Sequence, residues 1–162
     1  GIAITVFGVI GGFLGSWLDS RLGTRRLVIL GLVIVMAGTA SVLLTDRTRM
    51  FGFDTGVALG KPLSTPQEWA FIASGAVIAL GAAFAISAMR ALMAMLAPEE
   101  RSAAYFGLYA LVGKATAFVG PTLVGLVAAA TGSVRSGVLV ALLFCGIGLA
   151  AMLMLKESDS AR

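Results

Sequence analysis

Five long apolar stretches follow one another along the chain and are separated by shorter polar segments. The stretches cover approximately residues 1–18, 27–44, 66–96, 102–130 and 134–155. An α-helix rises about 1.5 Å per residue, so each stretch is long enough to approach or exceed the apolar thickness of a bilayer. The pattern therefore predicts an all-α, polytopic membrane bundle of five transmembrane helices in one domain, residues 1–162.

The polar segments predict where the helices end. The longest, residues 45–65, is rich in charged residues and glycine, and we expect an exposed loop that holds a short hairpin or turn. Thr65, Pro66 and Glu68 have the pattern of a helix N-terminus, in which Thr65 is the N-cap and Glu68 closes a capping box. The last segment, residues 156–162, is a polar tail.

Glycines recur every four residues in the first stretch. Gly8 and Gly12 form one pair and Gly11 and Gly15 form another, so two glycine-rich faces overlap on the predicted helix. In a bilayer such faces let a neighbouring helix approach closely. We therefore expect tight packing around the first helix.

A charged turn, Asp19–Arg26, separates the first two apolar stretches. Gly23 supplies a tight turn, and Arg21, Arg25 and Arg26 place three fixed positive charges around it. A positively charged loop between two membrane spans is expected on the cytoplasmic side. Lysine and arginine are also more frequent on that side of the predicted topology, which places the C-terminus in the cytoplasm.

Composition agrees with a membrane protein. Hydrophobic residues make up 59% of the chain and charged residues 12%, and the mean hydropathy is +1.00. The chain has no histidine and one cysteine, Cys145, so we expect no disulfide framework, no metal site and no cofactor. The net charge of +4 does not indicate nucleic-acid binding, because the basic residues lie mainly at the ends of the apolar stretches.

Two parts of the sequence resemble major facilitator transporters. The charged turn is similar to the loop that links their second and third, or eighth and ninth, helices, although Asp19 stands one position early and Ser20 occupies the usual aspartate position. Further on, Phe106-Gly-Leu-Tyr109 is followed by Lys114 and by Gly120-Pro121. This run resembles the eleventh helix of the vacuole effluxer-like branch. The chain can be laid on helices eight to twelve of such a protein.

The resemblance implies a fragment of a secondary active transporter that moves a small solute, such as an amino acid, by alternating access. A complete facilitator has two halves with the substrate between them, and five helices do not close that cavity. The expected partners are thus the bilayer, the solute and a missing N-terminal half, in a bacterial inner membrane. A non-transporting membrane scaffold or assembly protein is an alternative. A membrane enzyme is less favoured, because histidine and buried carboxylates for acid–base chemistry are absent.

Lys114 is the leading candidate functional residue. It follows Ser102 by twelve residues, about 18 Å along a helix, and so lies near the bilayer centre. An ammonium there costs at least about 2.5–3.5 kcal/mol on insertion scales, so it should face a cavity or a partner. Together with Thr116 it forms the candidate substrate site, where it attracts an anionic group or answers a coupling proton. Alternatively, Lys114 forms a structural ion pair with the missing half.

Three further features each allow two interpretations. Pro121 with Gly120 predicts a kink, which serves either as a hinge or as a site of close packing. Arg90 lies about two turns before Pro98, so it either guards a gate or extends to the cytoplasmic surface. The charged turn either latches the cytoplasmic gate or only caps helices and sets topology. The eight Asp and Glu residues lie in loops, at helix ends or in the tail, with Glu68 at the start of the third stretch, so a proton-coupling carboxylate would belong to the missing half.

Overall fold

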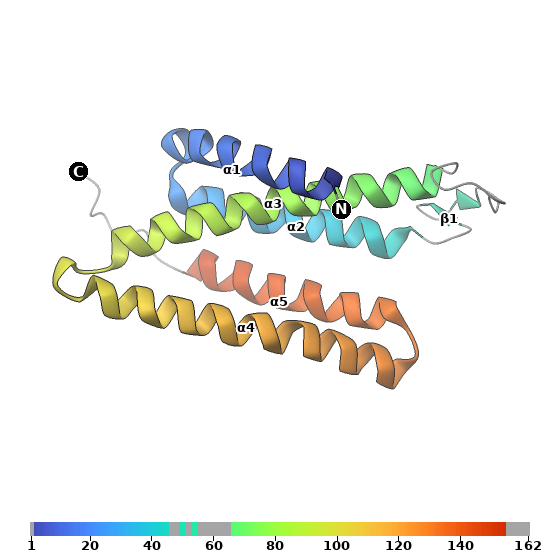
Figure 1. Ribbon diagram of the computed structural model, residues 1–162. Coiled ribbons are helices and arrows are strands. Elements are labelled where there is room, and N and C mark those ends of the chain that lie inside the picture. Colours follow the sequence, from blue (N-terminus) through green and yellow to red (C-terminus); the bar gives the residue numbers. More distant parts are fainter. Residues whose placement is uncertain (1, 46–48, 51–52, 55–65, 155–162) are drawn as a thin grey trace.

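The computed structural model describes residues 2–45, 49–50, 53–54 and 66–154. Its long helices are α1 (Ile2–Leu22), α2 (Thr24–Leu44), α3 (Pro66–Leu96), α4 (Ser102–Thr131) and α5 (Val134–Met154). A short 3-10 helix, η1 (Glu99–Arg101), precedes α4. The predicted all-α bundle of five helices is confirmed (Figure 1).

Four of the described helical segments are long and apolar enough to cross a membrane. They are Thr24–Leu44, Glu68–Leu96, Glu99–Thr131 and Val134–Met154. The chain is therefore a multi-pass membrane protein. α1 is not among these four segments.

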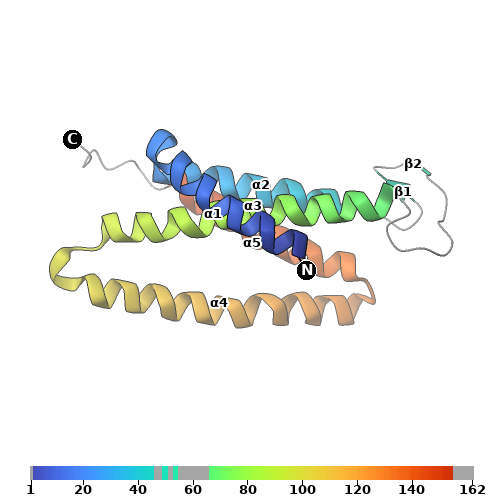
Figure 2. The ribbon, with the colours of Figure 1, turned by 45° about the horizontal axis from the view of Figure 1, so that its top comes forward.

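The helices form two unequal groups. α1, α2 and α3 pack against one another, α5 packs against α2, and α4 packs mainly against α5. Figure 2 shows α4 along one side of the molecule, apart from α3 over most of its length. The charged turn, the α3–α4 connection and the end of α5 lie at one end of the bundle, and the α4–α5 turn lies at the other (Figure 1).

Glycine allows α2 and α3 to approach to backbone contact. A Cβ atom added to Gly31 would lie 2.7 Å from the backbone nitrogen of Ala85 and 2.7 Å from the carbonyl oxygen of Gly81. Further along the same interface, the hydroxyl groups of Ser41 and Ser74 lie 2.9 Å apart and form a hydrogen bond. Small residues and an interhelical hydrogen bond are the usual means of joining helices in a bilayer.

One of the two glycine faces of α1 is also used in packing. A Cβ atom on Gly11 would lie 2.9 Å from the Cβ of Ala83, and Gly15 packs against Phe84, so this pair faces α3. Gly8 and Gly12 have no neighbouring atom within 4 Å among the described residues. The expected close packing of α1 therefore occurs on a single face.

The buried core lies near the end of the bundle that carries the charged turn. Leu27 and Val28 at the start of α2 are completely buried, together with Phe84 and Ala88 of α3 and Met152 of α5. Three helices therefore meet at this end. Because these side chains are apolar and fully packed, they fix the position of the charged turn above them.

The turn between α1 and α2 is shorter than the sequence indicates. α1 continues through Asp19 to Leu22, and Gly23 alone separates the two helices. Gly23 has a φ of 83°, a left-handed conformation that glycine adopts without strain, so the predicted tight turn is confirmed. Its amide donates a hydrogen bond of 3.1 Å to the carbonyl oxygen of Asp19, which extends α1 into the predicted loop.

The segment between α2 and α3 contains a small antiparallel hairpin, as expected. β1 (Arg49–Met50) pairs with β2 (Phe53–Asp54). α3 begins at Pro66, the first helical position expected from the sequence. The predicted N-cap, Thr65, lies outside the described residues, as does the polar tail 156–162.

Candidate functional site

Lys114 lies on the most exposed helix of the protein. None of the described residues of α4 is buried, and the side chain of Lys114 is exposed. Leu111 and Phe118 lie one turn before and one turn after it, on the same face, and are 66% and 74% exposed. Within the described part of the chain, no residue forms a hydrogen bond or an ion pair with Lys114. Its ammonium group is therefore available to a partner from elsewhere.

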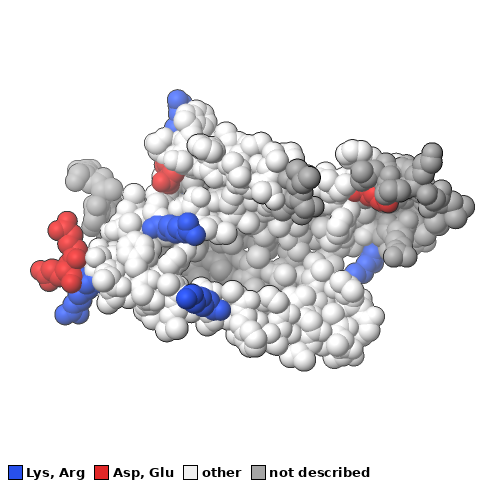
Figure 3. All heavy atoms as spheres, viewed as in Figure 1, with Lys and Arg blue, Asp and Glu red and all other residues white. Residues whose placement is uncertain are grey.

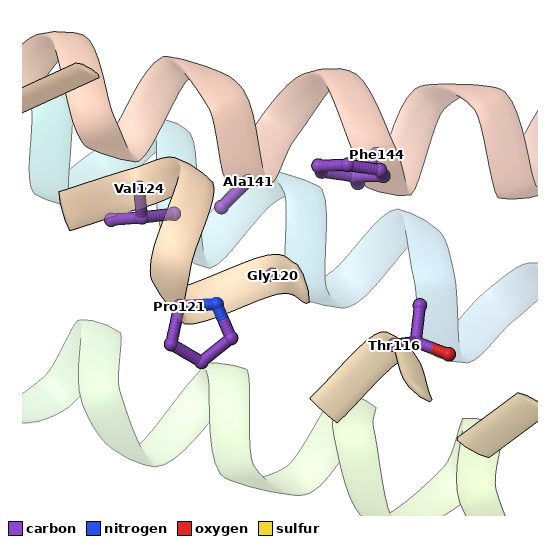
Figure 4. A pocket seen from close by; sticks show the side chains of 6 residues that line it. All are labelled: Thr116, Gly120, Pro121, Val124, Ala141 and Phe144. Atoms are coloured by element: carbon purple, nitrogen blue, oxygen red, sulfur yellow. The ribbon is translucent and has the colours of Figure 1, made fainter. Parts of the chain in front are cut away.

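Thr116 lies on a different side of α4 from Lys114. It lines a pocket of about 460 Å³ between α4 and α5, together with Gly120, Pro121, Val124, Ala141 and Phe144 (Figure 4). Lys114 does not line this pocket. Two residues along an α-helix correspond to a rotation of about 200°, so the two side chains point in nearly opposite directions. The Thr116 hydroxyl donates a hydrogen bond to the carbonyl oxygen of Val112 in its own helix.

Gly120 and Pro121 lie inside an uninterrupted helix. α4 continues from Ser102 to Thr131 with Pro121 in its interior. The hydroxyl of Thr122 donates a 2.8 Å hydrogen bond to the carbonyl oxygen of Phe118, next to the proline. The kink and its role as a hinge stay predictions, and the structure adds that both residues line the α4–α5 pocket.

Arg25 connects the charged turn to the end of α5. Its Nε and Nη2 atoms donate hydrogen bonds of 3.3 and 3.2 Å to the carbonyl oxygen of Met152, and Nη2 donates one of 3.3 Å to that of Leu153. The last carbonyls of a helix have no partner within the helix, so a cation there satisfies them and complements the helix dipole. Sequence reasoning missed this contact, since nothing local relates residues so far apart in the chain.

The other charges of the turn have different surroundings. The Arg21 guanidinium lies 4.8 Å from the centre of the Trp17 ring, in its own helix. Arg26 is exposed. One carboxylate oxygen of Asp19, Oδ1, is buried and accepts no hydrogen bond from the described residues. The turn therefore joins α2 to α5 through Arg25 and leaves an acceptor on Asp19 for a further donor.

Arg90 is an exposed residue of α3 with no hydrogen bond or ion pair to any residue in the described part of the chain. It is the single Lys or Arg in α3, and Lys114 is the single one in α4. Figure 3 shows a hollow between α3 and α4, with basic side chains over both helices at its edges.

Comparison of the sequence with known protein families identifies the family of this chain. The sequence profile described as "Vacuole effluxer Atg22 like" matches residues 1–162, the whole chain. The chain belongs to the vacuole effluxer Atg22-like family. The resemblance to this branch of the major facilitators, seen first in Phe106–Tyr109 and Gly120–Pro121, is confirmed.

Similar proteins in the vacuole effluxer Atg22-like family come from fungi. The chain is 30% identical over 139 residues to autophagy-related protein 22-2 of Neosartorya fischeri and to autophagy-related protein 22-1 of Aspergillus clavatus, which is 84% of this chain in each case. The aligned part covers 21% and 22% of those two proteins, so the chain spans about a fifth of their length. No solved structure matches the chain.

Proposed function

We propose that this chain is part of a secondary active transporter that moves a small solute, such as an amino acid, across a membrane by alternating access. Membership of a family of vacuole effluxers supports the proposal. The observation that carries it is Lys114, an exposed charge near the middle of an otherwise apolar helix. Charges at such a depth occur in membrane proteins mainly where they face a cavity or a partner, and they commonly mark the path of a solute or ion.

The surroundings of Lys114 support a path enclosed by further protein. Leu111 and Phe118 on the same face are apolar and largely exposed. Apolar side chains on this face can contact lipid. The ammonium group of Lys114, however, needs water or an opposite charge. We infer that the rest of a longer protein, the expected N-terminal half, covers this face and encloses a water-filled cavity at Lys114. In that cavity Lys114 attracts an anionic group of the solute or takes part in proton coupling.

We infer that the charged turn acts at the cytoplasmic gate. Arg25 holds the end of α5, and Asp19 has a buried acceptor that a donor from the other half can reach when the gate is closed. The C-terminus then lies on the same, cytoplasmic side. A bacterial inner membrane stays the expected location, although the two relatives named above are fungal.

The deciding experiment replaces Lys114 in the full-length protein. Lys114→Met keeps the approximate length of the side chain and removes its charge, so insertion and folding should be nearly unchanged while transport of labelled amino acids into proteoliposomes is abolished. Lys114→Arg should restore only part of the rate, because a guanidinium is broader and does not release its proton. Leu111→Met, one turn away on the same face, is the matched control and should transport normally.

A scaffold or assembly protein would give a different pattern. Such a protein needs no charge in the membrane, so Lys114→Met would leave its function intact or would raise its stability by removing an unpaired charge. Normal transport by Lys114→Met would instead mean that Lys114 is a tolerated structural charge. Either result would remove Lys114 from the proposed mechanism.

A further inference from the structure

One face of α1 carries large apolar side chains and ends at a basic residue. Exposed residues recur on this outer face of α1 at intervals of three or four positions: Val6, Ile10, Phe13, Trp17 and Arg21. The side chains of Phe13 and Trp17 are 78% and 56% exposed. Phe13 lies two residues from both Gly11 and Gly15, a rotation of about 200° in either direction. The outer face therefore points away from the contact that these glycines make with α3.

The size of these side chains favours lipid as the neighbour of the outer face. Helices that contact one another in a bilayer usually meet through small residues, as α1 meets α3 at Gly11 and Gly15. The outer face presents branched and aromatic side chains instead. Figure 1 shows α1 at the edge of the bundle. Flexible acyl chains can fill the space around such side chains, so this face fits lipid better than a further helix.

The packing of α1 on α3 indicates the depth at which the outer face ends. Gly15 packs against Phe84, and both helices run in the same direction towards the charged turn (Figure 1). Arg21 follows Gly15 by six residues and Arg90 follows Phe84 by six, which is about 9 Å along each helix. Each is the single basic residue of its helix, so both helices reach a positive charge at a similar depth. Because Trp is enriched at the headgroups and Arg extends towards them, Trp17 and Arg21 fit the headgroup level.

Arg21 keeps its full charge at this level. Its guanidinium lies 4.8 Å from the centre of the Trp17 ring, a cation–π contact. In the described part of the chain Arg21 forms no ion pair. Asp19, the acidic residue of α1, is two positions away and so lies on nearly the opposite side, where its Oδ1 atom is buried. The Trp17 ring therefore positions the guanidinium without neutralising it, and the planar fork of donors suits a phosphate group.

We propose that Trp17 and Arg21 form a binding site for an anionic phospholipid of the surrounding bilayer. The lipid phosphate binds the Arg21 guanidinium beside the Trp17 ring, and the acyl chains lie along Phe13 and Ile10. An anionic lipid is preferred because the headgroup of a zwitterionic one, such as phosphatidylcholine, carries its own cation next to the phosphate. This inference goes beyond the proposed function, because it concerns the lipid around the protein and not the solute.

Quenching of Trp17 fluorescence by brominated lipids tests the site. The full-length protein is reconstituted into phosphatidylcholine vesicles that contain a minor share of phosphatidylglycerol. In one preparation the phosphatidylglycerol has brominated acyl chains, and in the other an equal amount of the phosphatidylcholine has them. The Trp17 signal is the difference between each protein and the same protein with Trp17→Phe. Brominated phosphatidylglycerol should quench this signal more strongly, with a local enrichment of roughly fivefold, the effect of one basic residue beside an anionic lipid.

Three variants assign the enrichment to Arg21. Arg21→Gln should bring the two preparations to equal quenching, and it should fold normally because the side chain is exposed. Arg26→Gln is the matched control, since it removes the same charge from the same turn but lies in α2, outside the outer face, and it should retain the enrichment. Arg21→Lys should keep most of the enrichment, because an ammonium group also binds phosphate.

Three results would overturn the proposal. Equal quenching by the two brominated lipids in the unaltered protein would mean that Trp17 contacts lipid without selectivity. Absence of quenching by either lipid would mean that another part of the protein covers the outer face. An equal loss of enrichment in Arg21→Gln and Arg26→Gln would assign the effect to the overall charge of the turn. None of these measurements depends on transport, so the proposed function is tested separately by Lys114→Met.

Discussion

The glycines of α2 and α3 and the glycines of α4 have opposite surroundings. At Gly31 and Gly81, an added Cβ would come within 3.0 Å of the backbone of the neighbouring helix. At Gly107, Gly113 and Gly120 of α4, no described atom beyond the adjoining backbone of α4 itself lies within 4 Å of the same position. Small residues at helical spacing thus make a close contact in one part of the bundle and an open face in the other.

This difference distinguishes the helices that pack against one another within this chain from the helix surface that is left open. The α1–α3 group contains glycine contacts, an interhelical hydrogen bond and most of the buried core. α4 has no buried residue among those described and carries the isolated Lys114. Solute sites in secondary transporters, the class proposed for this chain, lie between two parts of the protein, near the middle of the membrane. We therefore interpret α1–α3 as the scaffold and the open side of α4 as the side that meets the solute.

The largest difference in unfolding free energy is expected between two glycine-to-alanine substitutions, one in the packed α1–α3 group and one in α4. Gly31→Ala should lower the free energy of unfolding by about 1–3 kcal/mol, since its Cβ meets backbone atoms that cannot move independently. Gly113→Ala should be neutral or stabilising by up to about 1 kcal/mol, because alanine favours the helix and has space there. Denaturant titration in detergent micelles measures both. Equal effects would mean that the two glycines have similar surroundings.

A smaller effect is expected where the charged turn joins the two groups. Arg25→Gln removes donors from the carbonyls of Met152 and Leu153, which should cost about 1–2 kcal/mol of unfolding free energy. Arg26→Gln is the matched control, because Arg26 is exposed in the same turn. The same titration compares the two variants. If both behave alike, the contact between Arg25 and α5 contributes no stability.

The smallest difference should come from hydroxyl groups in the two regions. Ser74→Ala breaks the hydrogen bond between α2 and α3 and should cost about 0.6 kcal/mol, a typical value for such bonds in membrane proteins. Thr122→Val in α4 removes only a hydrogen bond within its own helix and should have less effect. Melting temperatures of matched preparations provide the measurement. A larger loss for Thr122→Val would contradict the division into a packed and an open region.

Local features were predictable from the sequence, and contacts between distant segments were not. The helices follow the apolar stretches, Gly23 forms the turn, and α3 begins at Pro66. The contact of Arg25 with α5 could not be predicted, because it depends on how the helices pack. The opposite directions of Lys114 and Thr116, however, follow from their spacing by two and could have been inferred from helical periodicity.

The spacing of glycines in α1 does not predict which of its two glycine faces contacts another helix. Both faces have the same spacing, but Gly11 and Gly15 contact α3 while Gly8 and Gly12 do not. Sequence periodicity defines a face and does not identify its neighbour. The same limit applies to α4, where the pattern of small residues reveals an interface but not what covers it.

The most direct test of the account is the initial transport rate of Lys114→Met relative to Leu111→Met in the full-length protein, at equal amounts of folded protein in the membrane. The two variants alter neighbouring positions on the same face of α4 and introduce the same residue, so their ratio isolates the charge. We predict that Leu111→Met retains transport and that Lys114→Met has none. Equal rates for the two variants would contradict the claim that the open side of α4 meets the solute through Lys114.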